Sequence, residues 1–416
     1  MALVPNLRFP EFRAANEWTP AQLTDTLLSI SNGLSLSQTN QITPFRVTRI
    51  ETIADWTIDL CRIGYVDPTE DISDYKLNVG DILFSNINSV THIGKNVIVN
   101  ADMDLYHGMN LLRLVPNYSA VSPQFLFYLL NTEPLRTSFK ARANKAVNQA
   151  SINQTEVGKT NIYLPELPEQ RKIAECLSSL DELIAAERQK LDALKAHKNG
   201  LMQQLFPAEG ETVPRLRFPE FHDADKWETK CISDLGRIVT GSTPSTAIPE
   251  FYGGERLFVS PADISDERFI GLTHTTLTDL GFRQTRPIPP NSILFVCIGS
   301  IGKVAQNLVD CASNQQINAV IPNTKHCAAF LYYTLTQVAP QMAALAGRHV
   351  VPIINKTAFG NVEVILPKKA EQERIAECLS SLDESIAAQT LQIEALRAQK
   401  TGLMQQLFPS LDEVQA

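Results

Sequence analysis

The stretch IAECLSSLDELIAA occupies Ile173–Ala186, and IAECLSSLDESIAA occupies Ile375–Ala388, so that 13 of 14 positions are identical. The similarity continues on both sides, because Pro168–Pro207 and Ala370–Pro409 share 27 of 40 positions without a gap. Both copies end in GLMQQLFP. An internal repeat of this length organises the whole sequence, and it predicts the same long helix twice in one chain.

A second repeat precedes each variable region. VPNLRFPEF at Val4–Phe12 matches VPRLRFPEF at Val213–Phe221 in eight of nine positions, and a tryptophan follows each copy, Trp18 and Trp227. The chain is therefore a short repeated segment, a variable region and a long helix, followed by the same three parts again. We predict an N-terminal variable domain at 1–167, a central repeated helix at 168–206, a linker and second variable domain at 207–369, a C-terminal repeated helix at 370–409, and a tail at 410–416.

The joint between the halves indicates a circular organisation. The first LFP, Leu205–Pro207, leads through a short linker into the second VPRLRFPEF, whereas Leu407–Pro409 meets only the tail. That tail and the first three residues would take the place of the linker if the chain closed on itself. We therefore expect the termini to lie close together and the halves to be related by a pseudo-twofold axis.

Apolar residues recur in each repeated helix at alternating intervals of three and four, which is typical of a coiled-coil seam. The seam positions are Ile173, Leu177, Leu180, Ile184, Leu191, Leu194, Leu201 and Leu205 in the first copy, and Ile375, Leu379, Leu382, Ile386, Ile393, Leu396, Leu403 and Leu407 in the second. Polar residues interrupt the seams at Glu187, Lys198, Gln389 and Lys400, and such breaks can fix helix register. A helix of roughly 35 residues is about 50 Å long. Two related helices would pair antiparallel; alternatively, each covers only its own domain.

The variable regions contain short β-rich runs bounded by Gly, Asp and Asn. The runs are VTRIETI (Val47–Ile53), IGYV (Ile63–Val66), GDILFSNI (Gly80–Ile87), NVIVN (Asn96–Asn100) and LLRLV (Leu111–Val115) in the first domain, and RLFVS, SILFVCIGS and INAVIP in the second. Ser122–Ala143 is predicted to form one or two helices, and another helix is predicted from about Ala328 to Leu345. The predicted fold class is α+β: two mostly β domains with helices, joined by two long helices in an antiparallel coiled coil.

Composition and missing motifs exclude several classes of protein. The chain has 416 residues, 44% of them hydrophobic, which predicts a globular protein of two or more domains. It lacks an apolar run long enough for a membrane span, a secretory signal, and paired cysteines, so we expect a cytoplasmic protein with reduced thiols. It also lacks the phosphate-loop, dinucleotide, zinc-protease and nucleophile-elbow motifs and the D/N-P-P-Y/F stretch of adenine methyltransferases. Recognition is therefore favoured over catalysis, although a net charge of −8 argues mildly against nucleic acid.

Polar loops with basic residues occupy matching places in the two halves. Basic residues can position phosphates, and Asn, Gln and Arg can bind base edges in a major groove. The candidate DNA-binding residues are Asn86, Asn88, Thr91, His92, Lys95, Arg142, Lys145, Asn148 and Gln149 in the first domain, and Thr240, Ser242, Thr243, Tyr252, Lys303, Asn314, Gln315, Gln316, Arg348, His349 and Lys356 in the second. Tight turns and solvated helix ends would explain each residue equally well when it is taken alone.

Taken together, these segments resemble the specificity subunit of type I restriction–modification systems over almost the whole chain. The resemblance rests on LRFPEF before a tryptophan, on LPELPEQRKIAECLSSLDELIAA (Leu164–Ala186), and on its second copy at Leu366–Ala388. In the second domain TGSTPS, YGG, PADI and SIGKVAQN…SNQQINAVIP match a common kind of target-recognition domain. The first domain departs more, with NGLSLSQ and SNINSVTHIGK in these places, so its target is the less inferable.

The resemblance implies two target-recognition domains that each read one half of a split site in double-stranded DNA. Paired helices would set the unread spacer and dock two methyltransferase subunits, and motor–nuclease subunits would join to cut unmethylated DNA. S-adenosylmethionine, ATP and magnesium would belong to those partners, leaving this chain without a catalytic residue, metal or cofactor. Two alternatives remain: a protein-binding adapter with two heads on a coiled coil, and, against the missing motifs, a self-contained nuclease or methyltransferase.

Overall fold

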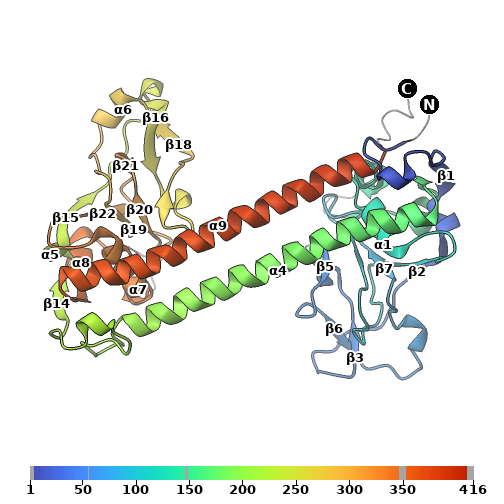
Figure 1. Ribbon diagram of the computed structural model, residues 1–416, viewed down its shortest axis with the longest axis horizontal. Helices are drawn as coiled ribbons and strands as arrows, with labels where there is room; N and C mark the ends of the chain where they lie inside the picture. Colours follow the sequence, from blue (N-terminus) through green and yellow to red (C-terminus); the bar gives the residue numbers. More distant parts are fainter. Residues whose placement is uncertain (1–3, 55, 146–148, 346–352, 410–416) are drawn as a thin grey trace. The chain divides into compact units, whose positions relative to one another are not determined.

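The computed structural model describes residues 4–54, 56–145, 149–345 and 353–409. Its internal contacts divide the chain into two compact units. Unit 1 comprises Met1–Arg188 and Gln392–Ala416, and unit 2 comprises Gln189–Leu391. Each unit therefore contains one variable domain and one segment of each long helix, α4 and α9 (Figure 1).

The two repeated segments form helices α4 (Leu167–Leu205) and α9 (Lys369–Leu407), each of 39 residues. The predicted seam is confirmed, because the seam residues are buried or half-buried while most of their neighbours are exposed. Polar Gln389, at a predicted break, is also buried in the seam. The narrow apolar stripe thus packs inward as the alternating spacing requires.

The helix segments run in opposite directions within each unit. In unit 1 the start of α4, with Ile173 and Leu177, shares a core with Leu407 at the end of α9. In unit 2 Leu205, at the end of α4, shares a core with Ile375 near the start of α9. The antiparallel pairing is therefore confirmed. The alternative that each helix covers only its own domain is wrong, because each helix supplies core residues to both units.

Lysines at the seam breaks bind aspartates on the facing helix. In unit 1 the Lys400 ammonium lies 2.6 and 2.7 Å from the Asp181 carboxylate oxygens, and in unit 2 the Lys198 ammonium lies 2.5 Å from Asp383. In each unit a tyrosine hydroxyl donates to the aspartate that binds the lysine. Tyr128 donates to Asp181 at 2.8 Å, and Tyr333 donates to Asp383 at 2.5 Å. We call this arrangement the Tyr–Asp–Lys cluster. Sequence analysis identified the breaks but not these partners.

An arginine of each LRFPEF segment joins the N-terminal repeat to the start of a long helix. Arg8 donates two hydrogen bonds to the Glu169 carboxylate, at 2.8 and 2.6 Å, and Arg217 binds Glu371 at 2.7 Å through both nitrogens. Both glutamates are almost fully buried. A buried bidentate pair is costly to break, since one charge is then left without a partner.

The tryptophan that follows each LRFPEF segment packs on a phenylalanine that directly follows the long helix of the other half. In unit 1 Trp18 contacts Phe125 and Phe408, with ring centroids 5.8 and 6.1 Å apart. In unit 2 Trp227 contacts Phe206 at 6.0 Å and Phe330 at 5.8 Å. The LFP motif after each helix is therefore a core element of the variable domain of the other half, which follows the first copy directly and lies far from the second copy in sequence.

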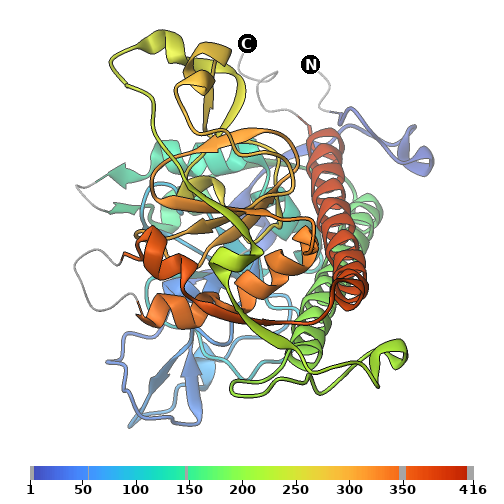
Figure 2. The ribbon, with the colours of Figure 1, turned by 90° about the vertical axis from the view of Figure 1, so that its left-hand side faces the viewer.

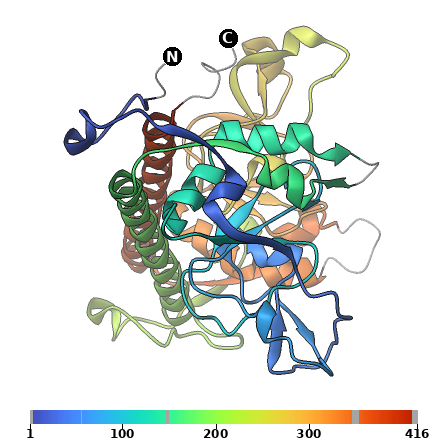
Figure 3. The ribbon, with the colours of Figure 1, turned by 90° about the vertical axis from the view of Figure 1, so that its right-hand side faces the viewer.

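The domain of unit 1 is built on a four-stranded sheet in the order β2-β10-β7-β9, which faces the reader in Figure 3. A two-stranded ladder of β1 and β13 joins the beginning of the domain to its end. The strands are β1 (Thr19–Gln22), β2 (Leu27–Asn32), β3 (Phe45–Val47), β4 (Ile53–Ala54), β5 (Thr57–Ile58), β6 (Gly64–Val66), β7 (Ile82–Phe84), β8 (Ile87–Asn88), β9 (Asn96–Ile98), β10 (Leu112–Pro116), β11 (Asn144–Lys145), β12 (Ala150–Ser151) and β13 (Asn161–Leu164). The helices are α1 (Pro123–Leu130), α2 (Glu133–Arg142) and α3 (Gln154–Gly158).

The domain of unit 2, which faces the reader in Figure 2, repeats this architecture with a five-stranded sheet in the order β15-β22-β19-β20-β17. A ladder of β14 and β23 again joins its beginning to its end. The strands are β14 (Glu228–Cys231), β15 (Gly236–Thr240), β16 (Tyr252–Val259), β17 (Phe269–Ile270), β18 (Thr275–Leu277), β19 (Ile293–Val296), β20 (Val304–Asn307), β21 (Cys311–Ser313), β22 (Ile317–Pro322) and β23 (Glu363–Leu366). The helices are α5 (Ile232–Leu235), α6 (Asp279–Arg283), α7 (Ala328–Leu345) and α8 (Lys356–Gly360).

The predicted elements are largely confirmed, with one correction. Ser122–Ala143 forms two helices, α1 and α2, and α7 spans the predicted Ala328–Leu345. Val47–Ile53 is not one strand, because a short 3-10 helix occupies Ile50–Thr52. The Thr52 hydroxyl accepts from the Arg49 backbone N–H at 2.8 Å and so favours a turn over continued pairing.

The circular organisation is confirmed by a pair of matching backbone hydrogen bonds. The Leu7 N–H donates to the Gln406 carbonyl at 2.9 Å, and the Leu216 N–H donates to the Gln204 carbonyl at 2.9 Å. The N-terminal segment therefore lies against the end of α9 just as the second LRFPEF segment lies against the end of α4. No helix in the described part of the chain has the length and apolar surface needed to cross a membrane.

Candidate nucleic-acid interfaces

Three polar turns meet at one end of the unit 2 sheet, where β15 and β19 end and β20 and β22 begin. We call this region edge 2: residues 240–245, 297–303, 313–316 and 353–356. The Ser242 N–H donates to the Ser313 carbonyl at 2.8 Å, and the Cys297 N–H donates to the Gln316 carbonyl at 2.8 Å. The Ile354 N–H donates to the Cys297 carbonyl at 2.9 Å and joins the last segment. Turns separated by more than 100 residues therefore form one surface.

Close backbone approach at edge 2 explains a glycine in the TGSTPS motif. A Cβ placed on Gly241 would lie 2.1 Å from the Asn314 carbonyl oxygen and 2.3 Å from that of Ser313. These backbone atoms cannot move aside as a flexible side chain could, so only glycine fits here. The TGSTPS turn is therefore held directly against the SNQQIN turn.

The predicted side chains of edge 2 hold one another in fixed orientations. The Thr240 hydroxyl donates to Asn318 Oδ1 at 2.6 Å, and the exposed Thr243 hydroxyl donates to Gln315 Oε1 at 2.8 Å. The Asn314 amide donates to Gln316 Oε1 at 3.0 Å. Amides that are already oriented can bind a base edge without ordering first, which lowers the entropic cost of binding.

Other predicted residues of unit 2 lie beside this network. The Tyr252 hydroxyl donates to the Pro244 carbonyl at 2.8 Å and so braces the TGSTPS turn. Lys303 is exposed, and its ammonium donates to the Ile264 carbonyl at 2.9 Å. Lys356 is exposed at the start of α8. Ser242 is half-buried, and its hydroxyl has no partner among the described residues. Arg348 and His349 lie outside the described residues.

The corresponding end of the unit 1 sheet forms edge 1, where β2 and β7 end and β9 and β10 begin. Edge 1 comprises residues 85–95, 108–111, 144–145 and 149–154. The Ser85 N–H donates to the Lys95 carbonyl at 2.8 Å and closes the first turn. Strand β12 pairs with β8, so that Ala150 lies opposite Asn88. The loop after α2 is thereby brought onto the same surface, as the matching positions in the sequence predicted.

The predicted histidine of edge 1 is held by hydroxyl groups. His92 is exposed, and its Nδ1 lies 2.6 Å from the Ser89 hydroxyl and 3.2 Å from the Thr91 hydroxyl. Partial burial and the nearby positive charges of Lys95 and Arg136 lower the pKa of His92 below its usual value. The imidazole is therefore neutral at pH 7 and can accept or donate a hydrogen bond, depending on its tautomer.

Two residues of unit 1 that were predicted to bind DNA, Arg142 and Asn86, serve the fold of the loops. The Arg142 guanidinium donates to the Glu156 carbonyl at 2.7 Å and to the Thr160 hydroxyl at 2.8 Å, which joins α2 to α3. Burial lowers the pKa of Arg142. Asn86 is buried, and its amide nitrogen donates to the Ile152 carbonyl at 3.4 Å. Sequence analysis placed both at a DNA surface, but the structure leaves little of either side chain available there.

The remaining predicted residues of edge 1 differ in their availability. Asn88 is half-buried and accepts from the Ser89 N–H at 2.8 Å, so it shapes the turn. Lys145 and Gln149 are exposed on either side of the hairpin between β11 and β12. Asn148 lies outside the described residues. Lys95 is half-buried, so the exposed predicted residues at edge 1 are Thr91, His92, Lys145 and Gln149.

Sequence analysis missed an exposed arginine at edge 2. The Arg286 guanidinium donates to the Thr240 carbonyl at 2.9 Å, although 46 residues separate them. Arg286 lies in the connection between α6 and β19, so no local motif links it to the TGSTPS turn. Arg286 adds a cation beside the amide network, where it can contact phosphate or guanine.

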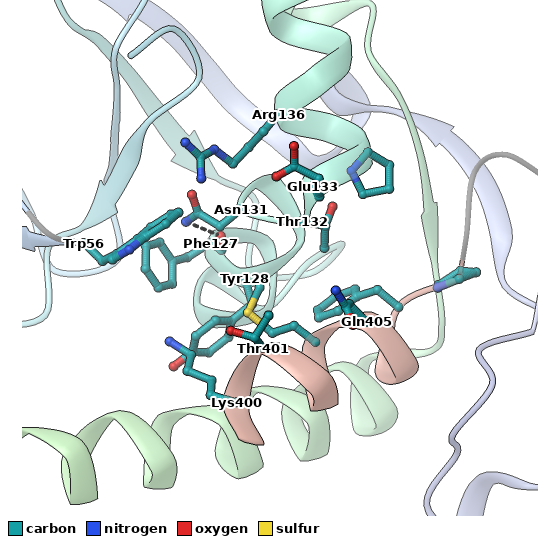
Figure 4. A pocket seen from close by; sticks show the side chains of 14 residues that line it. Trp56, Phe127, Tyr128, Asn131, Thr132, Glu133, Arg136, Lys400, Thr401 and Gln405 are labelled. Atoms are coloured by element: carbon teal, nitrogen blue, oxygen red, sulfur yellow. Dashed lines mark hydrogen bonds between the residues drawn. The ribbon is translucent and has the colours of Figure 1, made fainter. Parts of the chain in front are cut away.

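Unit 1 also has a cavity of about 470 Å³ between α1, α2 and the end of α9 (Figure 4). It is lined by Trp56, Phe127, Tyr128 and Arg136, among others, and the Arg136 guanidinium stacks over the Trp56 ring at 5.1 Å. In unit 2 the buried Arg268 stacks over the tyrosines of α7 instead. The space beside Phe127 and Tyr128 of α1 is thus open, whereas Arg268 occupies the space beside Tyr332 and Tyr333 of α7.

Comparison with known families decides the identity of the chain. The model of the type I restriction modification DNA specificity domain matches residues 16–196 and 224–396. The chain belongs to this family. It is thus a specificity subunit of a type I restriction–modification system, the component that recognises a DNA sequence. Across the described residues, no group of three or more His, Cys, Asp and Glu side chains is placed to hold a metal ion.

Relatives of the specificity family match over most of their length. The chain is 31% identical over 405 residues to a Methanocaldococcus jannaschii protein provisionally named the type I restriction enzyme MjaX specificity subunit, covering 94% of this chain and 93% of that one. It is 26% identical over 375 residues to the HindI specificity subunit of Haemophilus influenzae, covering 74% and 81%. Both specificity-domain matches include a variable region and most of a long helix.

Solved structures of this family share the fold. The crystal structure of the S subunit from M. genitalium aligns with a TM-score of 0.64 at 14% identity, covering 98% of this chain and all of that one. A chain from a structure concerned with complex assembly and conformational transition of a type I system aligns with a TM-score of 0.55 at 18% identity, covering 94% and 98%. The paired helices and two α+β domains are therefore those of type I specificity subunits.

Proposed function

We propose that each variable domain reads one half of a split, asymmetric site in double-stranded DNA. One observation carries this proposal: the four strands of the unit 1 sheet and the first four of the five strands of the unit 2 sheet follow the same order, yet edges 1 and 2 carry different side chains. A twofold scaffold with identical readers would suit a palindrome, with half-sites related by the same symmetry. Different readers on a repeated scaffold suit two different half-sites.

We also propose that α4 and α9 set the length of the unread spacer and dock two methyltransferase subunits, with motor–nuclease subunits joining the assembly. Most residues of both helices outside the seam are exposed, which leaves a long surface for partners. S-adenosylmethionine, ATP and magnesium would then be bound by those partners, and this chain would be non-catalytic. Partners that supply phosphate contacts would also offset the chain's net charge of −8.

The first experiment is to sequence host DNA by a method that detects N6-methyladenine, with the gene for this chain intact and deleted. We expect deletion to abolish methylation of one split motif whose halves differ in sequence. A lost motif that is palindromic would contradict the two-reader proposal. Unchanged methylation, together with no salt-sensitive DNA affinity in the complex with its methyltransferase partner, would favour a protein-binding adapter.

A matched pair of variants assigns the half-sites to the edges. Gln315→Ala at edge 2 should relax sequence preference in one half-site only, because an amide bound to a base edge contributes about 1–3 kcal/mol of discrimination. Gln149→Ala at edge 1 should affect only the other half-site. Both residues are exposed, so neither change should alter thermal stability. Relaxation of both half-sites by one variant would contradict the assignment.

A further inference from the structure

An exposed imidazole beside edge 2 is held by a buried carboxylate. His274 is 80% exposed, whereas the Asp263 side chain is only 1% exposed. His274 Nδ1 lies 2.6 Å from Asp263 Oδ1, and the His274 backbone N–H donates to the same oxygen at 2.8 Å. Two bonds to one oxygen fix both the backbone and the ring, so the imidazole is oriented before any ligand arrives.

The other Asp263 oxygen is also satisfied. It accepts from the Ser260 N–H at 2.8 Å and from the Ser260 hydroxyl at 2.6 Å. Burial alone would raise the pKa of Asp263, but the hydrogen bonds from Ser260 and His274 outweigh it and hold the pKa below its usual value. An ionised carboxylate only accepts hydrogen bonds, so His274 Nδ1 carries the ring proton. In the neutral imidazole, Nε2 then has a free lone pair that faces away from Asp263.

Backbone contacts place this pair beside the predicted turns of edge 2. The Asn314 N–H donates to the Val259 carbonyl at 3.0 Å, immediately before the Ser260–Asp263 turn. The Lys303 ammonium donates to the Ile264 carbonyl at 2.9 Å, immediately after it. The turn therefore lies between the SNQQIN and GSIGK turns, although none of its residues was among the predicted DNA-binding set.

A residue close by in the sequence also suits a base edge. Leu272, two residues before His274, is 88% exposed. An exposed aliphatic group can contact the methyl group of thymine, while an acceptor nitrogen can bind an amino group in the major groove. Adenine N6 and cytosine N4 are the two amino groups presented there.

We propose that His274 is a further specificity-determining residue of unit 2, accepting through Nε2 a hydrogen bond from an adenine or cytosine amino group in the major groove. Asp263 is its positioning residue. This inference rests on the proposed function, since it requires that unit 2 read DNA. It adds a segment, residues 260–274, that the predicted set of edge 2 did not include.

Two conservative variants separate contact with DNA from support of Asp263. Asn at position 274 can place its amide near the Nδ1 site and still donate to Asp263, but it has no atom at the Nε2 site. Gln reaches further and can place an acceptor near the Nε2 site. If His274 only supports Asp263, His274→Asn should preserve sequence preference better than His274→Gln. If His274 binds a base, His274→Gln should preserve it better.

The experiment measures binding of the full chain, in complex with its methyltransferase partner, to duplexes that carry the motif found by methylation sequencing. Each half-site is scrambled in turn at fixed salt. We expect His274→Asn to lower the preference for the intact half-site about tenfold and His274→Gln to retain it within about threefold. The control is His222→Asn, since His222 is another exposed histidine of unit 2 and its Nε2 binds the Arg217 carbonyl. The control should be unchanged.

Base-pair substitutions along the affected half-site then identify the contact. Under the proposal, His274→Asn loses discrimination at a single adenine or cytosine position. A uniform loss across all sequences would indicate a phosphate contact and overturn the proposal, as would wild-type preference in His274→Asn. These failures are distinct from failure of the proposed function, in which the wild-type complex itself would show no preference for its motif.

Discussion

Arg8 binds Glu169 in unit 1 as Arg217 binds Glu371 in unit 2, and a Tyr–Asp–Lys cluster of the same three residue types occurs in each unit. At the edges this correspondence ends. Edge 1 holds a histidine between hydroxyl groups, whereas edge 2 holds a network of Asn, Gln and Thr side chains. Contacts made by the repeated LRFPEF segments and long helices recur in both units, while the contacts between turns at the sheet ends differ. The repeated segments therefore maintain the scaffold, and the turns at the sheet ends carry the differences.

The largest effect is expected from removal of the phenylalanine that follows each long helix. We expect Phe408→Ala to destabilise unit 1 and Phe206→Ala to destabilise unit 2, each by about 3–5 kcal/mol, because both side chains are buried in an aromatic core. Hydrogen exchange measured by mass spectrometry would locate the loss of protection in each variant.

The two variants are each other's controls. Phe408→Ala should leave exchange within 228–366 unchanged, and Phe206→Ala should leave exchange within 19–164 unchanged. Loss of protection in both units in either variant would mean that the units do not unfold separately. It would also contradict the division of the core between them.

Acid should distinguish the units through His107 of unit 1. This side chain is buried, its Nε2 binds the Leu111 carbonyl at 3.0 Å, and burial lowers its pKa from 6.5 to about 4. Between these values the unfolded chain binds more protons than the folded chain, so stability falls as pH falls from 6.5 to about 4. The loss at the acid end of this window is about 3 kcal/mol.

Urea denaturation of the wild type and His107→Gln at several pH values would measure this loss. The variant should lack the part of the acid dependence that His107 supplies, even if it is less stable at pH 7. Burial raises the pKa of Asp81 in the same unit, which opposes the effect of His107, so the difference between the two proteins is the informative quantity. Parallel pH profiles would contradict the prediction.

A smaller effect is expected at the seam breaks. Lys198→Met and Lys400→Met should each cost about 1–2 kcal/mol, because both ion pairs are only partly exposed and each aspartate keeps its tyrosine partner. Double-mutant cycles with Asp383→Asn and Asp181→Asn would measure the coupling by thermal unfolding. The Lys400 pair should couple less strongly, since 42% of the Asp181 side chain is exposed against 18% for Asp383. Equal coupling would refute that ordering.

The smallest effect concerns phosphate contacts at the two edges. Lys145→Ala and Lys356→Ala should each weaken DNA binding about equally for all sequences and reduce the slope of log affinity against log salt by about 1. Both side chains are exposed, so thermal stability should not change. A change in sequence preference with an unaltered salt slope would instead assign these lysines to base recognition.

Local spacing and repetition made the scaffold predictable. The alternating seam of α4 and α9 has a period set by helix geometry, and near-identical copies implied related halves. The end of the 47–53 run was not predictable, because the Thr52 hydroxyl converts an apparent strand into a turn. The Lys400–Asp181 pair spans 219 residues, and no local pattern connects such positions.

The sequence predicted which loops form the candidate interfaces, but not which side chains in those loops are available for binding. Matching polar loops do meet at the same end of each sheet, since sheet topology brings them together. Individual side chains depended on contacts that composition does not contain. Arg142 resembles a phosphate ligand in sequence but binds Glu156 and Thr160 in the fold. His274 is distinguished only by its buried partner Asp263, 11 residues away, and no local pattern connects the two.

The division of the chain between the units has a consequence for the order of its synthesis. The first part of unit 1, Met1–Arg188, precedes unit 2 in the chain, but Leu407 and Phe408 of its core follow unit 2. At about 5–20 residues per second, the ribosome needs on the order of 10–40 s to make the intervening unit 2. Until Leu407 and Phe408 are made, the nascent first domain lacks part of its core and exposes apolar surface to chaperones and proteases. By then all residues of unit 2 have been synthesised. The domain that is made first is the last to close.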